Sequence, residues 1–567
     1  MNLTRIQEFF LKKPTSWDVL WMSLFTVFIT GQPLFMRHEI IMMEAGIHLP
    51  AINALFHGLV PYRDFFFLRG PMELYVPALM MKIFGVSSAL LPVFYYVGTM
   101  ATLILCVIIA GQLLQSRFIF YMMVPAFVAR TFPRIAYYYW GGMRYAMGFL
   151  VILCLFYFFK TRRNFWIFLT GLTAGLAFLT TAEAGISTIA ASVAALGFAA
   201  LFGVIEWRSA VKSFLLFCLG LLVTIGPFFI YLAVNGAFAA YVECNLVVIK
   251  YNHVVFPGTE YQLPAGFMGF LTAFWIGLQK FEYASPLFCY IFFAGYLVYR
   301  FFQKKLNRTD AFMAGLAVYG FILYAMAFRK IEGHHFEMAL QAEKFLYFFL
   351  AEFAVLYFWL NNAKRWHKKA AYGLAAVILI SSLGYAFQRF DHRFTMFKLI
   401  KKNVFHSKKV KSLSFLDGME TSEPTVPRAR GHVVPRWQAE EIDGVVAFLQ
   451  SHTGPDEAVF CFPEVGNFNF WADRPFVGRF PIATFSWHYQ PLHDQMVEDF
   501  KKAHPRYVVM TNLGHRTFPA KWYFRVESNV RNFNHVTQLI LKNYDPVKSF
   551  ESVSIYQIKP SRESLVE

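Results

Sequence analysis

The chain has 567 residues, a formal net charge of +18 and a mean hydropathy of +0.42, with 57% hydrophobic and 16% charged residues. Soluble domains are about half apolar and about a quarter charged, so this composition excludes an ordinary soluble protein. A basic soluble chain would suggest nucleic-acid binding, but here much of the positive charge lies in short loops between apolar blocks. The sequence therefore predicts a protein of the lipid bilayer that binds no nucleic acid.

Apolar segments follow one another as far as residue 387, and a helix of about 20 apolar residues crosses the hydrocarbon core of a membrane. This pattern predicts an all-α polytopic membrane domain over residues 1–390, with about 11 transmembrane helices. The expected spans are 17–36, 88–114, 116–131, 141–159, 165–181, 184–205, 212–234, 283–301, 310–328, 340–360 and 370–387.

Basic residues gather in four loops that would all lie on one side of such a domain. Cytoplasmic loops carry an excess of Lys and Arg, so the N-terminus is predicted to be cytoplasmic. The polar stretches 37–87, 235–282 and 329–339 and the C-terminal region would then lie outside the cytoplasm. The four basic clusters are Lys160–Arg163, Arg208 with Lys212, Arg300–Arg308 and Lys364–Lys369.

The C-terminal third has a different pattern. Residues 391–433 are rich in lysine and predict a basic linker, which leaves a soluble α/β domain over 434–560. Within it, short apolar runs that alternate with helical patterns predict strands and helices in turn. The expected helices are 439–451, 493–503 and 534–543, and the expected strands are 458–462, 507–510 and 553–558.

The first outer loop, residues 37–87, is the most informative stretch. Apolar residues recur at helical spacing over 47–57, which predicts an amphipathic helix along the membrane surface. Gly58 is then placed to end that helix, and Pro61 to form a turn. The loop carries acids, histidines and arginines to the predicted outer surface of the membrane.

Several motifs in this loop resemble the first periplasmic loop of the GT-C glycosyltransferases, membrane enzymes that use polyprenyl-phosphate sugars. These motifs are Glu44-Ala45-Gly46, the run from Gly58 to Phe65 (GLVPYRDF) and Gly70-Pro71. Later stretches are similar to the same family, namely Gly171–Ala177, Glu183–Gly185 and Arg329–His335.

The sequence departs from the family in three places. Related chains usually have Asp where Glu44 stands and often a second acid where Ala45 stands. They often carry Lys where this chain has Thr180-Thr181, which leaves the contact with the carrier phosphate open.

The resemblance implies a GT-C fold and a glycosyltransferase of the plasma (inner) membrane. Its donor would be a polyprenyl-phosphate-linked sugar, and its acceptor a hydroxyl of a glycan, a lipid or a protein. Such an enzyme needs a carboxylate to accept the acceptor's proton, and the motif favours Glu44, with Glu39 in reserve. The alternative for either acid is that it only caps the surface helix, since acids favour helix N-termini.

Cationic groups would bind the phosphate, because arginine matches phosphate oxygens with a planar fork. Alternatives stay open for several of these residues. Arg63 and Asp64 could pair and fix the turn. Arg144 could belong to an interfacial aromatic belt, and Glu183 could simply be solvated. His334 and His335 with Glu332 would be a poorly spaced metal site, so a divalent metal is no more than an alternative and no cofactor is firmly predicted. The candidate substrate- and phosphate-binding residues are Arg63, Asp64, Arg69, Arg144, Glu183, Arg329, His334 and His335.

Two other classes of function stay open. A multi-pass transporter would have inverted repeats and polar residues at the bilayer midplane, whereas the polar residues here concentrate in outer loops. A catalytically inactive GT-C-like scaffold of envelope glycan assembly would fit the missing second acid and the missing lysine. Within the enzyme class, a ligase or polymerase of lipid-linked polysaccharide is a further alternative.

Overall fold

The computed structural model of the protein describes residues 11–30, 39–131, 138–255, 268, 281–327, 339–360, 365–393, 419–514 and 523–560. The chain forms two compact units, and each is built from segments that are far apart in the sequence. Unit 1 comprises Met1–Pro33, Tyr95–Gly226 and Pro264–Leu413. Unit 2 comprises Leu34–Phe94, Pro227–Leu263 and Ser414–Glu567.

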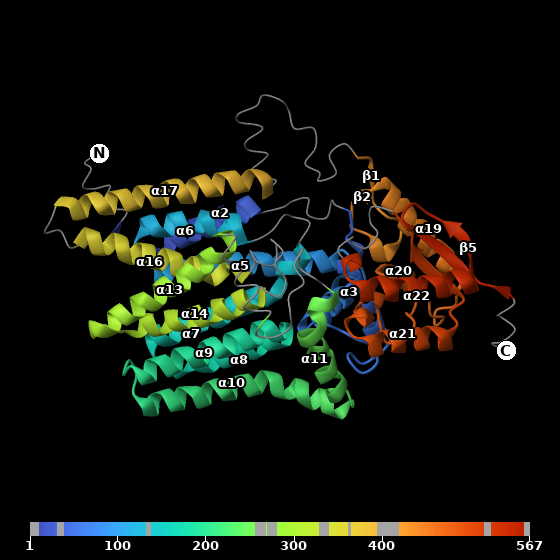
Figure 1. The fold of residues 1–567 in the computed structure, drawn as a ribbon, viewed down its shortest axis with the longest axis horizontal. Coiled ribbons are helices and arrows are strands. Elements are labelled where there is room, and N and C mark those ends of the chain that lie inside the picture. Colours follow the sequence, from blue (N-terminus) through green and yellow to red (C-terminus); the bar gives the residue numbers. More distant parts are fainter. Residues whose placement is uncertain are drawn as a thin grey trace, which may run out of the picture. The chain divides into compact units, whose positions relative to one another are not determined.

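Unit 1 is helical throughout its described part, and its helices pack side by side (Figure 1). Helix α9 packs against α14, and α7, α8 and α9 all pack against one another. The helices are α2 (Ser16–Thr30), α5 (Leu90–Leu113), α6 (Arg117–Thr131), α7 (Tyr138–Thr161), α8 (Asn164–Thr180), α9 (Ala182–Leu201), α10 (Trp207–Val234), α13 (Phe281–Phe302), α14 (Arg308–Ala327), α16 (Gln341–Leu360) and α17 (Arg365–Arg393). Helices α5 and α10 each run from one unit into the other, with the changes of unit at Tyr95 and Pro227.

Several of these helices have the length and composition of membrane spans. Within the described residues, five are long and apolar enough to cross a membrane, and others are apolar but shorter. The prediction of a polytopic helical membrane domain is therefore confirmed. The five are Leu90–Leu113, Met143–Thr161, Ala182–Leu201, Trp207–Val234 and Arg308–Ala327.

The glycine-rich run in α8 has a packing role. A Cβ added to Gly171 would lie 2.0 Å from the carbonyl oxygen of Phe217 in α10, and one added to Gly220 would lie 2.2 Å from the carbonyl oxygen of Phe168. Backbones approach this closely only where side chains are absent, and small residues serve this purpose between membrane helices. The Gly171–Ala177 motif thus brings α8 and α10 together.

The C-terminal part of unit 2 is an α/β fold around a four-stranded sheet of order β3-β4-β6-β5. Strand β3 pairs with β4 in parallel, whereas β6 is antiparallel to both β4 and β5. The strands are β3 (Phe460–Phe462), β4 (Tyr507–Thr511), β5 (Tyr544–Ser549) and β6 (Val553–Ile558), and the longer helices are α19 (Arg436–His452), α21 (Gln490–Ala503) and α22 (Glu527–Asn543). The three expected strands and three expected helices are all present, and β5 is an additional strand.

Shorter elements connect these parts. A two-stranded sheet and one 3₁₀ helix precede α19, and the other short helices follow β3. They are β1 (Thr421–Ser422), β2 (Val434–Pro435), the 3₁₀ helices η3 (Pro427–Ala429), η4 (Ala483–His488) and η5 (Tyr523–Arg525), and the short helix α20 (Asn467–Ala472).

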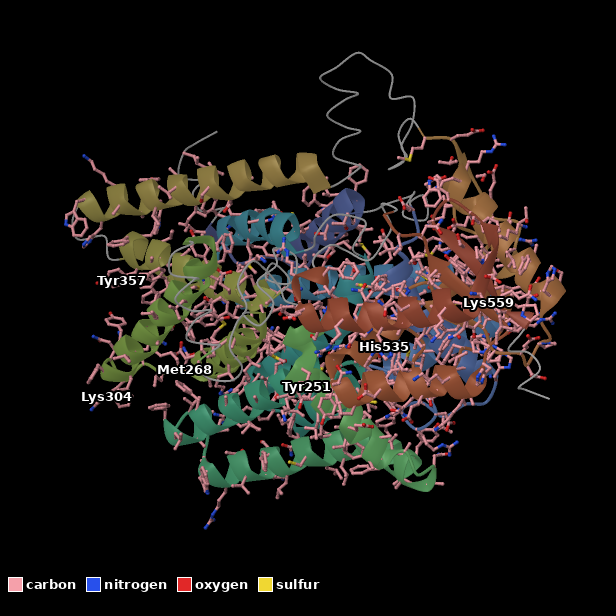
Figure 2. All side chains as sticks on the ribbon, turned by 45° about the vertical axis from the view of Figure 1, so that its right-hand side comes forward. Tyr251, Met268, Lys304, Tyr357, His535 and Lys559 are labelled. Carbon is pink, nitrogen blue, oxygen red and sulfur yellow. The ribbon has the colours of Figure 1, made fainter. Side chains whose placement is uncertain are left out.

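Three helices from earlier in the chain complete unit 2: α3 (Met42–Phe56), α4 (Met72–Phe84) and α11 (Phe238–Val255). Helix α3 packs against α20 and α4, and α11 packs against η4. Tyr251 of α11, labelled in Figure 2, stacks on Tyr489 with ring centroids 4.9 Å apart. Residues 39–87, α11 and the C-terminal region therefore belong largely to one compact unit.

Candidate functional site

Helix α3 carries the favoured catalytic acid near its start. Glu44 lies in the first turn of α3, one turn before His48, and the half-buried Glu39 lies just before the helix. The predicted helix is present, but the expectation of an amphipathic surface helix is wrong. Residues 45–54 are all buried, because α20 and α4 pack against the helix.

The entry to α3 is fixed by the C-terminal region. The backbone N–H of Ile40 donates to Oε1 of Gln438 at 2.9 Å, and Nε2 of Gln438 donates to the carbonyl oxygen of Ile40 at 3.2 Å. One buried amide side chain thus pairs with both polar backbone groups of a residue next to Glu39. The start of the candidate site is therefore held by α19.

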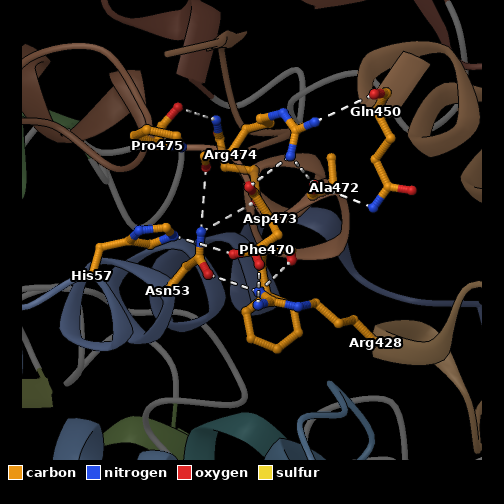
Figure 3. A network of polar contacts seen from close by, with 10 residues as sticks. Asn53, His57, Arg428, Gln450, Phe470, Ala472, Asp473, Arg474 and Pro475 are labelled. Atoms are coloured by element: carbon orange, nitrogen blue, oxygen red, sulfur yellow. Dashed lines mark hydrogen bonds and ion pairs between the residues drawn. The ribbon is translucent and has the colours of Figure 1, made fainter. Parts of the chain in front are cut away.

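The far end of α3 is fixed by a polar network that Figure 3 shows from close by. Asp473, which ends α20 with a left-handed φ of 55°, contacts Nε2 of His57 at 3.1 Å and Nη2 of Arg428 at 2.7 Å. Nη1 of Arg428 donates to Oδ1 of Asn53 at 2.7 Å. Both ends of the helix are thus joined to segments that lie about 400 residues later.

The turn after α3 is closed by an ion pair between neighbouring residues. Arg63 donates from Nε and Nη2 to the two carboxylate oxygens of Asp64, at 2.7 and 2.9 Å. Asp64 also accepts from the N–H of Val60 at 2.7 Å, and Nη1 of Arg63 donates to the carbonyl oxygen of Asn235 at 3.0 Å. The Arg63 hydrogen bond holds the pKa of Asp64 below its usual value. The two residues thus fix the turn, and their predicted role in phosphate binding stays a prediction.

Tyr62 links this turn to the end of the loop. Its backbone has a left-handed φ of 70°, and its ring is buried against Tyr241 with centroids 4.9 Å apart. A left-handed φ is a strained conformation for a bulky residue. The Tyr62 hydroxyl donates to the carbonyl oxygen of Arg69 at 2.9 Å, so the backbone of Arg69 is held from across the loop.

The side chain of Arg69 belongs to a charged cluster that includes an acid missed at the sequence level. Nη1 of Arg69 lies 3.4 Å from Oε2 of Glu73, and Nε2 of His48 lies 3.8 Å from the same oxygen. Glu73 and His48 are fully buried, whereas Arg69 is partly exposed. Burying a carboxylate is costly unless it is paired, so this acid is a strong candidate for a functional role. The signal in the sequence was its position in the first turn of α4, directly after Gly70-Pro71.

Two further candidates lie in unit 1. Arg144 is half-buried in α7, with its guanidinium 4.9 Å from the ring centre of Tyr145, which fits an aromatic belt. Glu183 is exposed in the first turn of α9, where Thr181 caps the helix by accepting from the N–H of Ala184. An acid at this position interacts favourably with the helix N-terminus, and a substrate contact of Glu183 stays a prediction.

The remaining candidates, Arg329, His334 and His335, lie outside the described residues. The alternative of a divalent metal at the two histidines therefore stays a prediction. Among the residues that the structure describes, no group of three or more His, Cys, Asp or Glu side chains could hold a metal ion.

The fold has counterparts among solved structures. The crystal structure of ArnT from Cupriavidus metallidurans bound to undecaprenyl phosphate superimposes with a TM-score of 0.53 at 12% sequence identity, over 96% of this chain and 98% of that one. The apo structure of the same protein gives a TM-score of 0.51 with the same identity and coverage. The chain has the GT-C fold. No family model and no curated protein matches the sequence.

The GT-C fold covers both the helical part and the C-terminal α/β region, because the likeness extends over nearly the whole length of both chains. The predicted fold class, and the fold that the sequence resemblance implied, are thereby confirmed. At 12% identity the likeness concerns the fold, so the chemistry must be argued from this chain's own residues.

Proposed function

We propose that the protein is a membrane glycosyltransferase that moves a sugar from a polyprenyl-phosphate carrier to a hydroxyl group on the outer face of the membrane. The observation that carries this proposal is the first loop of a GT-C fold, where Arg69 lies beside the buried Glu73. A solved protein of the same fold holds undecaprenyl phosphate. The basic loops support a cytoplasmic N-terminus and an extracytoplasmic C-terminal region.

The reaction needs little machinery, since a sugar phosphate is already activated. The acceptor oxygen attacks the anomeric carbon from the side opposite the phosphate, which inverts that carbon. As the new C–O bond forms, the bond to the phosphate oxygen breaks and its electron pair leaves with the polyprenyl phosphate. We assign Glu44 as the base that takes the acceptor's proton, with Glu39 in reserve, because base catalysis requires a carboxylate within hydrogen-bond reach.

Arg69 is the first choice for the phosphate. Its guanidinium is partly exposed, its backbone is held by Tyr62 and its charge is balanced by Glu73. Donors fixed in place before the reaction stabilise charge as it develops on the leaving group. Arg144, Arg329, His334 and His335 are second choices, whereas Arg63 and Asp64 fix the loop that carries Arg69.

A deletion strain tests the proposal even while the sugar is unidentified. Loss of a transferase leaves its donor unused, so mass spectrometry of lipid extracts should show a polyprenyl-phosphate sugar that accumulates. Expression of the wild-type chain should remove it, and the mass of the lipid would identify the sugar. Glu44→Gln should fail to remove it, since loss of a general base costs about a hundredfold or more in rate.

Glu527→Gln is a matched control, because Glu527 is an exposed acid in the first turn of α22. It should clear the lipid as the wild type does. Full clearance by Glu44→Gln and by Glu39→Gln would exclude both acids as the base. A lipid profile unchanged by the deletion would exclude the transferase itself.

A further inference from the structure

Arg479, in the C-terminal region, contacts two other segments of unit 2. Its Nη2 lies 2.7 Å from Oε2 of Glu243 in α11 and 3.5 Å from the carbonyl oxygen of Tyr62 in the first outer loop. Its guanidinium lies 5.8 Å from the ring centre of Phe66. The side chain is 14% exposed, so this cation is largely enclosed by the segments that it joins.

The backbone of Arg479 contacts the same loop. Its carbonyl oxygen accepts from the N–H of Phe66 at 2.8 Å. The ring of Phe66 packs against Phe480 and Phe485, with centroids 5.6 and 6.1 Å away. A backbone hydrogen bond, an enclosed guanidinium and two aromatic rings therefore hold the middle of the loop.

The position of Arg479 is itself set by its neighbours. Gly478 has a φ of +68°, and a Cβ on it would lie 2.5 Å from Cβ of Asp499. The N–H of Arg479 donates to Oδ2 of Asp499 at 3.3 Å. The turn needs glycine both for its left-handed conformation and for the close approach of α21.

A continuous path of contacts leads from Arg479 to Arg69. The guanidinium of Arg479 reaches the backbone of Tyr62, and the hydroxyl of Tyr62 holds the carbonyl oxygen of Arg69. Arg69 in turn lies beside Glu73. Each step joins atoms that the structure places in contact, so a shift of Arg479 would be passed on to Arg69.

We propose that Arg479 is a positioning residue for transfer, which fixes the loop of Tyr62–Arg69 through its ion pair with Glu243. This inference deepens the proposed function and rests on it. It makes the C-terminal α/β region a working part of the site: that region supplies no reacting group but sets where the arginine of the first loop lies. A displacement of about 1 Å in such a group can cost about a hundredfold in rate.

The ion pair by itself contributes little stability, because Glu243 is 44% exposed and exposed pairs are weak. The value of the contact lies in orientation, which a double-mutant cycle can test. Suitable variants are Arg479→Ala, Glu243→Ala and the double variant that carries both changes. Arg436→Ala is the matched control, because Arg436 pairs with Glu420 and Glu440 on the exposed surface of the same unit.

Each full-length variant would be reconstituted in nanodiscs and measured in two ways. Hydrogen exchange of peptides that cover residues 58–71 reports the loop, with the strands β3 and β4 as a check of folding. Titration with undecaprenyl phosphate, the probe, reports the phosphate site. We expect Arg479→Ala to exchange faster in the loop alone and to bind the probe about tenfold more weakly. Glu243→Ala should cause part of both losses but no further loss in the Arg479→Ala background, and the control should match the wild type.

Other results would overturn the inference. Unchanged hydrogen exchange of the loop and unchanged probe binding in Arg479→Ala would do so, as would losses in the double variant that equal the sum of those in the two single variants. If Arg479→Ala loses β3 and β4 as well, Arg479→Lys replaces it, with a smaller loss expected in the loop alone. A wild-type protein that binds no undecaprenyl phosphate would count against the proposed function. The hydrogen exchange of residues 58–71 would still test the role of Arg479.

Discussion

The hydroxyl of Tyr62 donates to the carbonyl oxygen of Arg69, seven residues later in the same loop. This hydrogen bond joins a buried aromatic ring to the backbone of the arginine that we assign to the phosphate. The strained φ of Tyr62 is maintained because its ring is enclosed by α11 and by the end of α10.

Tyr62→Phe tests this bond with little change of shape. Loss of the hydroxyl leaves the Arg69 carbonyl without this donor, so we expect about 1 kcal/mol less stability. Transfer should fall several-fold, measured as accumulated carrier-linked sugar in the complemented deletion strain. Tyr75→Phe is the control, because the Tyr75 hydroxyl bonds to that of Tyr231 at an exposed position. Equal effects of the two variants would contradict a special role for Tyr62.

Glu73→Gln should impair both folding and transfer. Removing one charge from a buried pair costs about 3 kcal/mol or more, and Arg69 would lose the carboxylate beside it. Thermal unfolding of the purified protein measures the first effect, and clearance of the carrier-linked sugar measures the second. Glu73→Asp keeps the charge and should restore part of both. Wild-type transfer by Glu73→Gln would remove this acid from the site.

The C-terminal region should lose stability in acid. His488 is buried in η4, and desolvation lowers its pKa to about 4. An unfolded histidine has a pKa near 6.5, so below that value the unfolded state binds the proton more readily. The contribution of the neutral histidine is fully present above about pH 6.5 and is lost as the pH falls towards 4, by about 3 kcal/mol.

Hydrogen exchange of β3 and β4 at about pH 7.5, 6 and 5, corrected for the intrinsic rate, measures this loss. His488→Gln removes one titrating group and should reduce the dependence on pH; the rest should come from His493, whose pKa desolvation also lowers to about 4. The corresponding change at the exposed His452 should leave the dependence as it is in the wild type. Protection of the strands that does not vary across this range of pH would contradict the prediction.

Gly171→Val should separate α8 from α10. The new side chain would meet the backbone of Phe217, which cannot move aside as a flexible side chain could. Overpacking of this kind costs about 1–3 kcal/mol or more. Gly197→Ala is the control, since apart from the nearby backbone of its own helix nothing lies within 4 Å of a Cβ at that position of α9. The yield of monodisperse protein after detergent extraction, with thermal unfolding, distinguishes the two.

The sequence predicted those features that depend on local chemistry. Gly58 has the positive φ expected of a residue that ends a helix, and β6 begins and ends at the expected residues. Strand β5 was missed because five of its six residues are exposed and its sequence, YDPVKS, contains proline and charges. Such a strand depends on pairing with β6 rather than on its own pattern.

The site was predicted only in part, for a related reason. The motif drew attention to the loop and to Arg69, but the burial of Glu73 and its approach to His48 depend on how α3 and α4 pack. The apolar spacing of residues 47–57 predicted a helix correctly. It could not predict that α20, from more than 400 residues later, would help to cover that helix.

The distance along the chain between Ile40 and Gln438, 398 residues, sets an order of events during biosynthesis. The ribosome delivers the first loop to the membrane long before it has made the residues that hold the loop in place. Helix α3 is therefore made before α20, which packs against it, and all the spans of the helical part are inserted in the meantime. The polypeptide can acquire its proposed activity only in the last stage of its synthesis. A chain released early, even one with every membrane helix inserted, would leave the apolar residues of α3 without the packing of α20.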